Sequence, residues 1–303
     1  MPSFTDRLRF LVSPRFRAEH PLVPVVRLSG AIGAGGGLRQ GLSFQGVAAA
    51  LERAFSLPGA KAVALLVNSP GGSPTQSHLI HRRIRLLATE KELPVYAFCE
   101  DAAASGGYMI ACAADEIFAD PNSIVGSIGV VSGGFGFHEL IERWGIERRL
   151  YTTGENKAIL DPFKPEDPKD IARLRTIQER IFAGFKDLVR TRRGEKLDLT
   201  QEDELFSGAF WAGEDARALG LVDGIGEIRT TLREKLGEKV RLRLVQPPRP
   251  GVLAQILRRG PQQEAPLGGL GAMLDGGAGT GLLDPRAALA ALEERALWSR
   301  LGL

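Results

Sequence analysis

The run Ala62-Val-Ala-Leu-Leu-Val67 leads directly into Asn68-Ser-Pro-Gly-Gly-Ser73. Six consecutive apolar residues predict a short strand that is buried on both faces, as in a parallel sheet covered by helices. The glycine pair that follows leaves backbone amides open at the carboxyl end of this strand, where α/β folds bind ligands. The same glycines are also typical of a plain tight turn, and the Gly-x-x-x-x-Gly-Lys-Ser/Thr pattern of a phosphate-binding loop does not follow them.

Further apolar runs and helical patterns alternate on both sides of this strand. Strands are expected at residues 23–28, 94–98, 116–119, 128–131, 149–152 and 240–245. Helices are expected at residues 43–55, 74–87, 139–144 and 214–219, after Ser105, and from Pro168 onward. The helix from Pro168 has Asp167 as its N-cap and an apolar stripe of Ile171, Leu174, Ile177, Ile181, Phe185 and Leu188. This alternation favours an α/β architecture with a largely parallel sheet.

Composition limits the classes of protein to which the chain can belong. Its 303 residues are 44% hydrophobic, which suffices for a sizeable core. The net charge of +3 comes from 39 basic and 36 acidic residues, so the balance does not indicate a nucleic-acid partner. The basic cluster at residues 81–85 is expected to be a solvated helix face. Two cysteines, Cys99 and Cys112, are too few for a disulfide framework and are expected in the core of a protein from a reducing compartment.

The two ends of the chain differ from its middle. Residues 1–20 contain several arginines and no long apolar run, which argues against a secretory signal or a transmembrane helix. We therefore expect a cytoplasmic protein with at most peripheral contact with the inner membrane. Residues 247–280 are rich in proline and glycine, and a helix that begins at Asp284-Pro285 is expected to dock on its own or a neighbouring subunit. The predicted division is an N-terminal extension at 1–21, a main domain at 22–246 and a tail at 247–303.

Ser105 lies in the segment Asp101-Ala-Ala-Ala-Ser-Gly-Gly-Tyr108. The small residues before it let a substrate backbone approach, and Gly106 and Gly107 let the chain turn sharply into a helix. A helix that starts there directs free N–H groups and the positive end of its dipole at nearby negative charge. An acyl-transfer enzyme needs such a position to stabilise a tetrahedral oxyanion, so Ser105 is a candidate nucleophile.

A nucleophilic serine needs a base that removes its proton. The histidines His20, His78, His81 and His138 show no recognisable triad spacing, and we expect His78 and His81 on a solvated helix face. A lysine in an apolar pocket is the other option, because burial disfavours an ammonium group. Lys157 is the candidate, although a lysine in a loop is by itself typically solvated.

Five stretches, in this order, resemble the S49 family of serine peptidases, the family of signal peptide peptidase A. They are Val67-Asn-Ser-Pro-Gly-Gly72, Ala104-Ser-Gly-Gly-Tyr108, Gly126-Ser-Ile-Gly129, Gly154-Glu-Asn-Lys157, and Phe210-Trp-Ala-Gly-Glu-Asp-Ala216 with Gly220-Leu-Val-Asp223. The match extends over residues 22–235. The combination is specific, although no single stretch is.

The resemblance implies roles for five residues. Ser105 occupies the position of the nucleophile, and Lys157 that of the general base. Ser127 matches a second serine whose hydroxyl holds the lysine amine in place; on its own it is more typical of a turn. Gly72 and Gly106 match the sources of the two oxyanion amides. The implied fold is the ClpP/crotonase-like spiral of strand–strand–helix (ββα) units, in agreement with the α/β pattern.

The resemblance also implies a serine endopeptidase with a Ser/Lys dyad that hydrolyses unstructured, fairly apolar peptides such as signal-peptide remnants. This chemistry needs no cofactor, nucleotide or metal, and the sequence has no His/Cys cluster with metal-ligand spacing. Short relatives form rings in which the serine and the lysine come from neighbouring subunits, so we expect a homo-oligomeric ring with shared active sites. Membrane-bound relatives carry an N-terminal transmembrane helix, which the pattern here does not predict.

Two other functions fit parts of the sequence. A crotonase-like acyl-CoA enzyme would share the fold and the paired oxyanion amides, but such an enzyme more often needs a carboxylate than a Ser–Lys pair. The second alternative is a catalytically inactive relative that serves as a peptide-binding or scaffold ring. The presence of Ser105, Ser127 and Lys157 argues against it.

Overall fold

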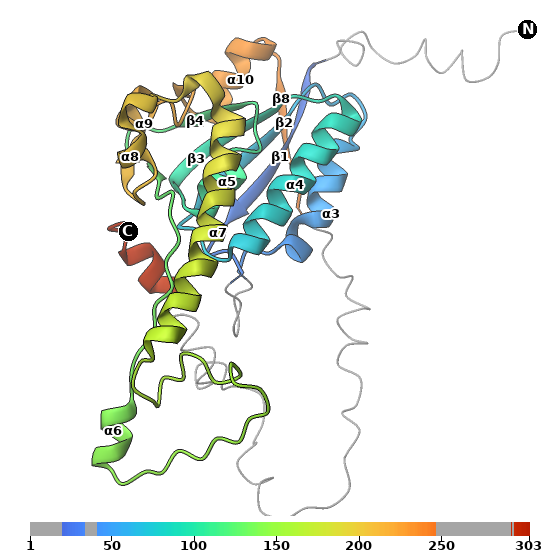
Figure 1. Ribbon diagram of the computed structural model, residues 1–303. Coiled ribbons are helices and arrows are strands. Elements are labelled where there is room, and N and C mark those ends of the chain that lie inside the picture. The colour runs from blue at the N-terminus through green and yellow to red at the C-terminus, as the bar shows by residue number, and fades with distance from the viewer. Residues whose placement is uncertain (1–19, 34–40, 247–291, 293) are drawn as a thin grey trace, which may run out of the picture.

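A computed structural model describes residues 20–33, 41–246, 292 and 294–303. Its centre is a sheet in the strand order β6-β5-β3-β2-β1-β8, with β4 and β7 branching from β3 (Figure 1). Neighbouring strands run parallel except for β5 and β6. The strands are β1 (Leu22–Ser29), β2 (Val63–Ser69), β3 (Val95–Ala104), β4 (Glu116–Ala119), β5 (Ile124–Gly126), β6 (Phe210–Ala212), β7 (Gly224–Ile225) and β8 (Arg241–Leu244). The predicted α/β class with a largely parallel sheet is confirmed.

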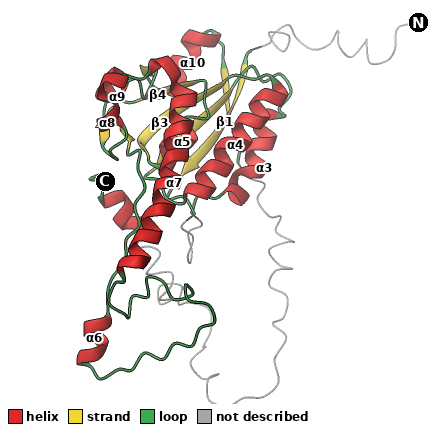
Figure 2. Cartoon of the chain, viewed as in Figure 1, coloured by secondary structure: helices red, strands yellow, loops and turns green. Residues whose placement is uncertain are grey.

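Helices cover one face of the sheet, where α3, α4, α5 and part of α7 lie in front of the strands (Figures 1 and 2). The helices are α3 (Phe44–Phe55), α4 (Pro74–Lys91), α5 (Gly106–Ala111), α6 (His138–Arg143), α7 (Pro168–Arg193), α8 (Glu202–Leu205), α9 (Gly213–Ala218) and α10 (Ile228–Leu236). The larger core lies between the two layers and includes Leu28, Leu65, Ile80, Ile84 and Ile110. A second cluster, to which Leu232 of α10 belongs with Phe98 and Phe118, covers part of the other face.

Capping residues explain where the longer helices begin. The hydroxyls of Ser43 and Ser73 and the carboxylate of Asp167 each accept a hydrogen bond from a backbone N–H in the first turn of the helix that follows. Pro74 and Pro168 occupy first helical positions, where their missing N–H groups cost nothing. The predicted starts of α3, α4 and α7 are therefore confirmed.

Three strand predictions differ from the structure. β3 continues past its predicted end at residue 98 to Ala104, so it runs directly into Ser105. The strand predicted at 128–131 lies earlier, at β5, because Gly126 and Ser127 have φ values of 113° and 53°, which end the extended conformation. The stretch predicted as a strand at 149–152 is irregular and pairs with none of the described strands.

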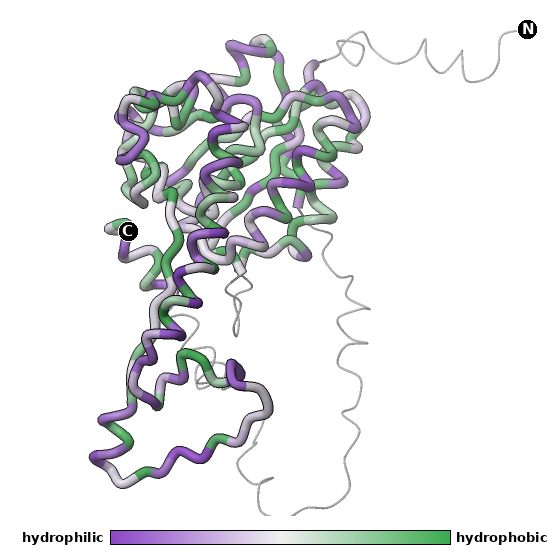
Figure 3. The backbone as a smooth tube through the Cα atoms, viewed as in Figure 1, coloured by the Kyte–Doolittle hydropathy of each residue, from purple (hydrophilic) through white to green (hydrophobic). Residues whose placement is uncertain are grey.

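Residues 130–167, which we call the arm, leave the body of the protein and include α6 (Figure 1). The first turns of α7 project with the arm, and Figure 3 shows apolar stretches on it at a distance from the core. Of the apolar stripe predicted for α7, Phe185 is buried in the core, whereas Ile177 and Ile181 are exposed. The predicted helix is confirmed, and its apolar stripe packs on the core only in the C-terminal half of α7.

The predicted solvated face of α4 is wrong for His81. Its side chain is buried, with 9% of the residue exposed, because this face of α4 packs against α5. Burial and the positive charge of Arg192 lower the pKa of His81 to about 4, so it is neutral at physiological pH. His78, three residues earlier, is exposed as predicted.

The remaining sequence predictions have mixed outcomes. Cys99 and Cys112 are buried and free, as expected of core residues. Among the described helices, none is both long enough and apolar enough to cross a membrane. Nearly all of the predicted N-terminal extension, and residues 247–291 of the predicted tail, lie outside the described residues.

Candidate active site

Ser105 stands on a sharp turn between β3 and α5. Its backbone has φ 52° and ψ −118°, a conformation that favours glycine and strains any other residue. The turn is held by the Ser105 N–H, which donates to the Gly126 carbonyl at 2.7 Å, and by the Ser105 carbonyl, which accepts from the Met109 N–H at 3.0 Å. The half-buried hydroxyl makes no capping hydrogen bond to the helix. This strand–turn–helix geometry presents a serine oxygen in the way that nucleophile elbows do.

The glycine turn after β2 packs directly against Ser105. Gly71 and Gly72 have φ values of 102° and 136°, which side chains rarely adopt. A Cβ atom on Gly71 would lie 2.7 Å from the Cβ atom of Ser105 and 3.0 Å from the amide nitrogen of Gly106. A Cβ atom on Gly72 would collide with the backbone of Ile32. Glycine is therefore required at both positions, and Gly71 is a site residue that the sequence analysis did not single out.

Buried serines fix this turn and the helix beside it. The Ser69 hydroxyl donates to the Gly30 carbonyl at 2.8 Å and accepts from the Gly71 N–H at 3.2 Å. Gly107 packs against the backbone of Ser69, and Gly106 packs against the hydroxyl of Ser77 on α4. These contacts hold the β2 turn and the start of α5 at a fixed separation. They could not be predicted, because turn serines are common and their partners are distant in the sequence.

The predicted oxyanion amides, those of Gly72 and Gly106, are both available. The Ile32 N–H donates to the Gly71 carbonyl, and the Ser73 N–H donates to the Ile32 carbonyl, each at 2.8 Å. The N–H of Gly72 lies between these two bonds and has no acceptor among the described residues. The N–H of Gly106, at the first position of α5, has none there either. Two unused donors beside a serine hydroxyl can stabilise an oxyanion on a carbonyl that the serine attacks.

Ser127 lies next to Ser105. Ala104 pairs with Gly126 across parallel strands β3 and β5, so the residues that follow each of them leave the sheet side by side. Ser127 also has a positive φ, and its N–H donates to the Ala209 carbonyl at 2.6 Å. The structure thus brings Ser105, Ser127 and Gly72 together on one cavity of about 530 Å³. The rest of its lining includes Val130, Val131, Ser207, Phe210, Leu297, Arg300 and Leu301.

Lys157, the predicted base, is not part of this cavity within one chain. It lies in the arm with its side chain exposed, and its N–H donates to the Gly154 carbonyl at 3.2 Å. The apolar pocket that the sequence analysis expected around this lysine is therefore not formed by the single chain. The structure brings four of the five predicted site residues together and leaves the fifth apart.

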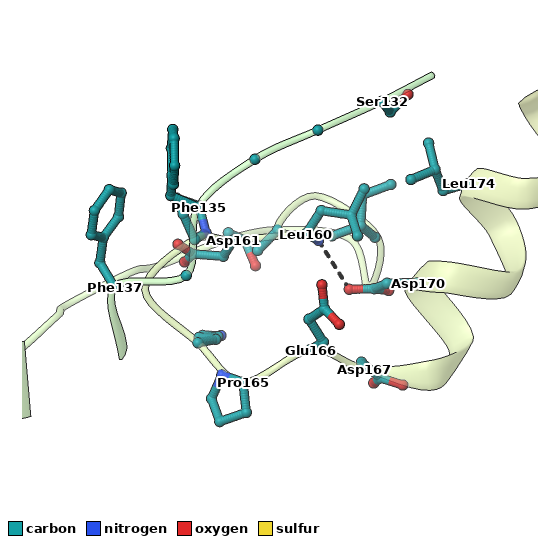
Figure 4. A pocket seen from close by; sticks show the side chains of 18 of the residues that line it. Ser132, Phe135, Phe137, Leu160, Asp161, Pro165, Glu166, Asp167, Asp170 and Leu174 are labelled. Carbon is teal, nitrogen blue, oxygen red and sulfur yellow. Dashed lines mark hydrogen bonds between the residues drawn. The ribbon is translucent and has the colours of Figure 1, made fainter. Parts of the chain in front are cut away.

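The arm has an ordered interior of its own. The Phe137 N–H donates to the Pro162 carbonyl at 2.6 Å, and the guanidinium of Arg148 lies over the Phe163 ring and pairs with the buried carboxylate of Asp161. A cavity of about 960 Å³ lies between the arm and the start of α7. Figure 4 shows side chains that line it and the hydrogen bond from the Leu160 N–H to the Asp170 carboxylate. Away from these cavities, the surface of the arm carries exposed apolar side chains, namely Leu140, Trp144, Ile146, Leu150 and Tyr151.

Residues 220–223, which end the fifth matched stretch and which we call the C-terminal signature, contact α5 and α7. The Tyr108 hydroxyl of α5 donates to the Leu221 carbonyl at 2.8 Å. The buried guanidinium of Arg193 pairs with Asp223 at 2.7 Å, and Lys196 pairs with the same carboxylate at 2.6 Å. Burial alone would raise the pKa of Asp223, but the hydrogen bonds from these two cations outweigh it and lower the pKa. The segment therefore anchors α7 and α5 rather than taking part in chemistry.

Acidic, histidine and cysteine side chains do not gather into a metal site in the part of the chain that the structure describes. At Ser105, the groups available for chemistry are its hydroxyl, two backbone amides and the hydroxyl of Ser127.

Comparison with known proteins gives relatives of several lengths. The chain is 50% identical over 306 residues to the Na(+)/H(+) antiporter NhaA of Brucella abortus, covering 98% of this chain and 39% of that protein. It is 35% identical to Protease 4 of Haemophilus influenzae over 72% of this chain and 35% of that protein. It is also 35% identical to the chloroplastic serine protease SPPA of Arabidopsis thaliana over 55% of this chain and 24% of that protein. The chain thus spans less than half the length of each of these relatives.

A solved structure of a mutant of the 1510-N membrane-bound stomatin-specific protease aligns with 76% of this chain and 99% of its own, at 16% identity and a TM-score of 0.48. The family model described as "Peptidase family S49" matches residues 88–242, which is half of the chain and includes the elbow at Ser105, Ser127 and the arm. The chain therefore belongs to peptidase family S49, a family of serine-type peptidases.

Proposed function

We propose that this chain is a serine endopeptidase of the serine–lysine type, with Ser105 as nucleophile and Lys157 as general base. One observation carries the proposal: the strained turn at Ser105 leaves a free hydroxyl beside two backbone amides that have no acceptor among the described residues. Strain of this kind persists where the surrounding structure demands it, and it clusters at active sites.

In the proposed reaction, the neutral amine of Lys157 accepts the Ser105 proton as the serine oxygen attacks the substrate carbonyl. The N–H groups of Gly72 and Gly106 stabilise the oxyanion, and loss of one such donor typically costs about 3–4 kcal/mol of transition-state stabilisation. The lysine then protonates the leaving amine and later activates the water that cleaves the acyl-enzyme. Ser127, at the adjacent strand end, orients the lysine amine, as the carboxylate does in a Ser-His-Asp triad.

The site is proposed to be completed by a neighbouring subunit of a homo-oligomeric ring. Two observations support this arrangement: Lys157 is exposed and outside the Ser105 cavity in its own chain, and it lies on an arm whose outer surface is unusually apolar. Exposed apolar side chains in such numbers are typical of an interaction surface. An arm that packs on the next subunit would bury its lysine beside that subunit's Ser105.

The proposed substrates are unstructured, fairly apolar peptides, with signal-peptide remnants as one example. The cavity beside Ser105 is lined by Val130, Val131 and Phe210, which suit apolar side chains, and its volume of about 530 Å³ suits a short stretch of peptide rather than a folded domain. We further propose that the protein acts in the cytoplasm, with at most peripheral contact with the inner membrane, and without a metal or nucleotide.

A crotonase-like acyl-CoA enzyme is the second candidate, because paired free amides also polarise a thioester carbonyl. Acyl-CoA turnover that survives Ser105→Ala would favour it, since that chemistry does not use the serine. An inactive peptide-binding ring is a third candidate, and it would bind a peptide that it never cuts.

Co-expression of two inactive variants tests the proposal. Ser105→Ala and Lys157→Ala should each abolish peptide hydrolysis, and rings assembled from equal amounts of both should regain roughly a quarter of the sites, because only the interface with both native residues is complete. Lys164→Ala, another exposed lysine of the arm, is the matched control and should keep full activity. Full activity of either inactive variant would refute the dyad, and no recovery in the mixed rings would refute the shared site.

A further inference from the structure

The described end of the chain lies against the strand ends that carry Ser105 and Ser127; Figure 1 draws this end in red, beside α7. Residues 294–299 are helical, and the Leu301 N–H donates to the Trp298 carbonyl at 2.9 Å, which turns the last residues back on the helix. Leu301 is buried, with 9% of the residue exposed, in a cluster with Ala102 and Ala104 of β3. Ala104 directly precedes the candidate nucleophile.

This segment shares the cavity of the candidate active site. Leu297, Arg300 and Leu301 line the same space of about 530 Å³ as Ser105 and Gly72. Trp298 also packs on the alanine cluster, together with Ile124 of β5. Leu301 therefore covers the apolar surface beside Ala104 that a peptide lying along the end of β3 would otherwise contact, and the open part of the cavity lies next to it.

The contact has the character of a bound ligand rather than of a core element. Beyond Leu301 and the half-buried Leu297 and Trp298, the segment is largely solvent-exposed, with Leu292 65% exposed and Leu303 52% exposed. A segment held by so few apolar contacts opens at a lower free energy than the body of the fold. Because it is tethered to the domain, it nevertheless remains at a high effective concentration near the cavity.

We propose that residues 297–303 are a resident ligand of the Ser105 cavity, where they occupy the place of an apolar stretch of substrate and compete with it. Leu301 is the anchor, and its alanine-lined position is a subsite for a large aliphatic side chain. The molecules that displace the segment are apolar peptides with a leucine-like side chain at that subsite. This inference builds on the proposed peptidase function, but its test measures binding without hydrolysis.

The test uses the full chain and a fluorescent synthetic peptide with the sequence of residues 292–303. Leu301→Asp should expel the native segment, because a carboxylate cannot remain against the apolar alanines. Burial of a leucine side chain corresponds to roughly a ten- to hundred-fold change in binding, so the variant should bind the peptide at least about tenfold more tightly than the unaltered chain. Leu292→Asp makes the same change at an exposed position of the same segment and is the matched control; it should bind like the unaltered chain.

Two further measurements complete the test. The same peptide with aspartate at the position of Leu301 should bind the Leu301→Asp chain at least about tenfold more weakly, which ties binding to the leucine subsite. Leu301→Ala, a milder change, should act in the same direction to a smaller extent. Equal peptide binding by the unaltered, Leu292→Asp and Leu301→Asp chains would overturn the inference. Full hydrolytic activity of Ser105→Ala or Lys157→Ala would refute the proposed function and would leave this binding result unaffected.

Discussion

Acid titration of His81 offers a quantitative test of how α4 packs on α5. The side chain is buried, and its Nε2 atom has no hydrogen-bond partner among the described residues. Burial together with the charge of Arg192 lowers the pKa of His81 from 6.5 to about 4. In the unfolded chain this histidine is exposed and has a pKa near 6.5. Between pH 6.5 and about pH 4, the unfolded state therefore binds a proton that the folded state does not bind. The associated stability is fully present above pH 6.5 and is lost as the pH falls toward 4.

The size of this effect follows from the two pKa values. The difference between 6.5 and about 4 corresponds to roughly 3 kcal/mol of unfolding free energy, lost progressively below pH 6.5. His81→Leu removes the titrating group and the unpartnered nitrogen at similar volume. Between pH 7 and pH 4, the unfolding free energy of the unaltered chain should therefore fall further than that of His81→Leu. The difference between the two decreases should be about 3 kcal/mol.

Urea unfolding at a series of pH values measures both curves, and the difference between them removes the contribution of the carboxylates that titrate in both proteins. Parallel curves for His81→Leu and the unaltered chain would refute the burial of a neutral His81.

Two substitutions, each with a matched control variant, test other parts of the structure. Gly71→Ala places a Cβ atom 2.7 Å from that of Ser105 and should lower peptide hydrolysis by about a hundredfold or more, since small displacements of reacting groups cost this much. Gly59→Ala is the control. Gly59 also has a positive φ, but a Cβ atom there meets no described atom within 4 Å, so this variant should lose stability and keep its activity. Equal activity of the two variants would contradict the account of the turn. Arg193→Met should cost about 3–5 kcal/mol in urea unfolding, because it removes the buried partner of a carboxylate. Arg190→Met breaks an exposed ion pair and should lower the unfolding free energy by about 1 kcal/mol or less. Similar losses for the two arginine variants would refute the anchoring role of the C-terminal signature.

Local sequence was sufficient for the elements whose signals are local. Ser43 and Asp167 cap helices where they were expected, and the run at residues 62–67 is a strand buried in the sheet. The position of Ser105 at the start of a helix also followed from its glycine neighbours. In each case, a backbone requirement within a few residues determined the outcome.

Features that depend on distant partners were predicted less well. The end of β3 at Ala104 is set by its pairing with β5, and the burial of His81 is set by α5, neither of which is visible in a helical or alternating pattern. The amphipathic stripe of α7 correctly predicted a helix but could not reveal that Ile177 would project with the arm. Gly71 and Ser69 escaped notice because their role is a close approach between segments that are far apart in the sequence.

The central claim is that Ser105 is the nucleophile and that Lys157 activates it. A serine-reactive fluorophosphonate probe, followed by mass spectrometry of the digested protein, identifies the labelled residue directly. We expect a single label on Ser105, loss of labelling in Lys157→Ala, and unchanged labelling in Lys164→Ala. A label on a different residue, or labelling of Ser105 that is unaffected by Lys157→Ala, would contradict the account.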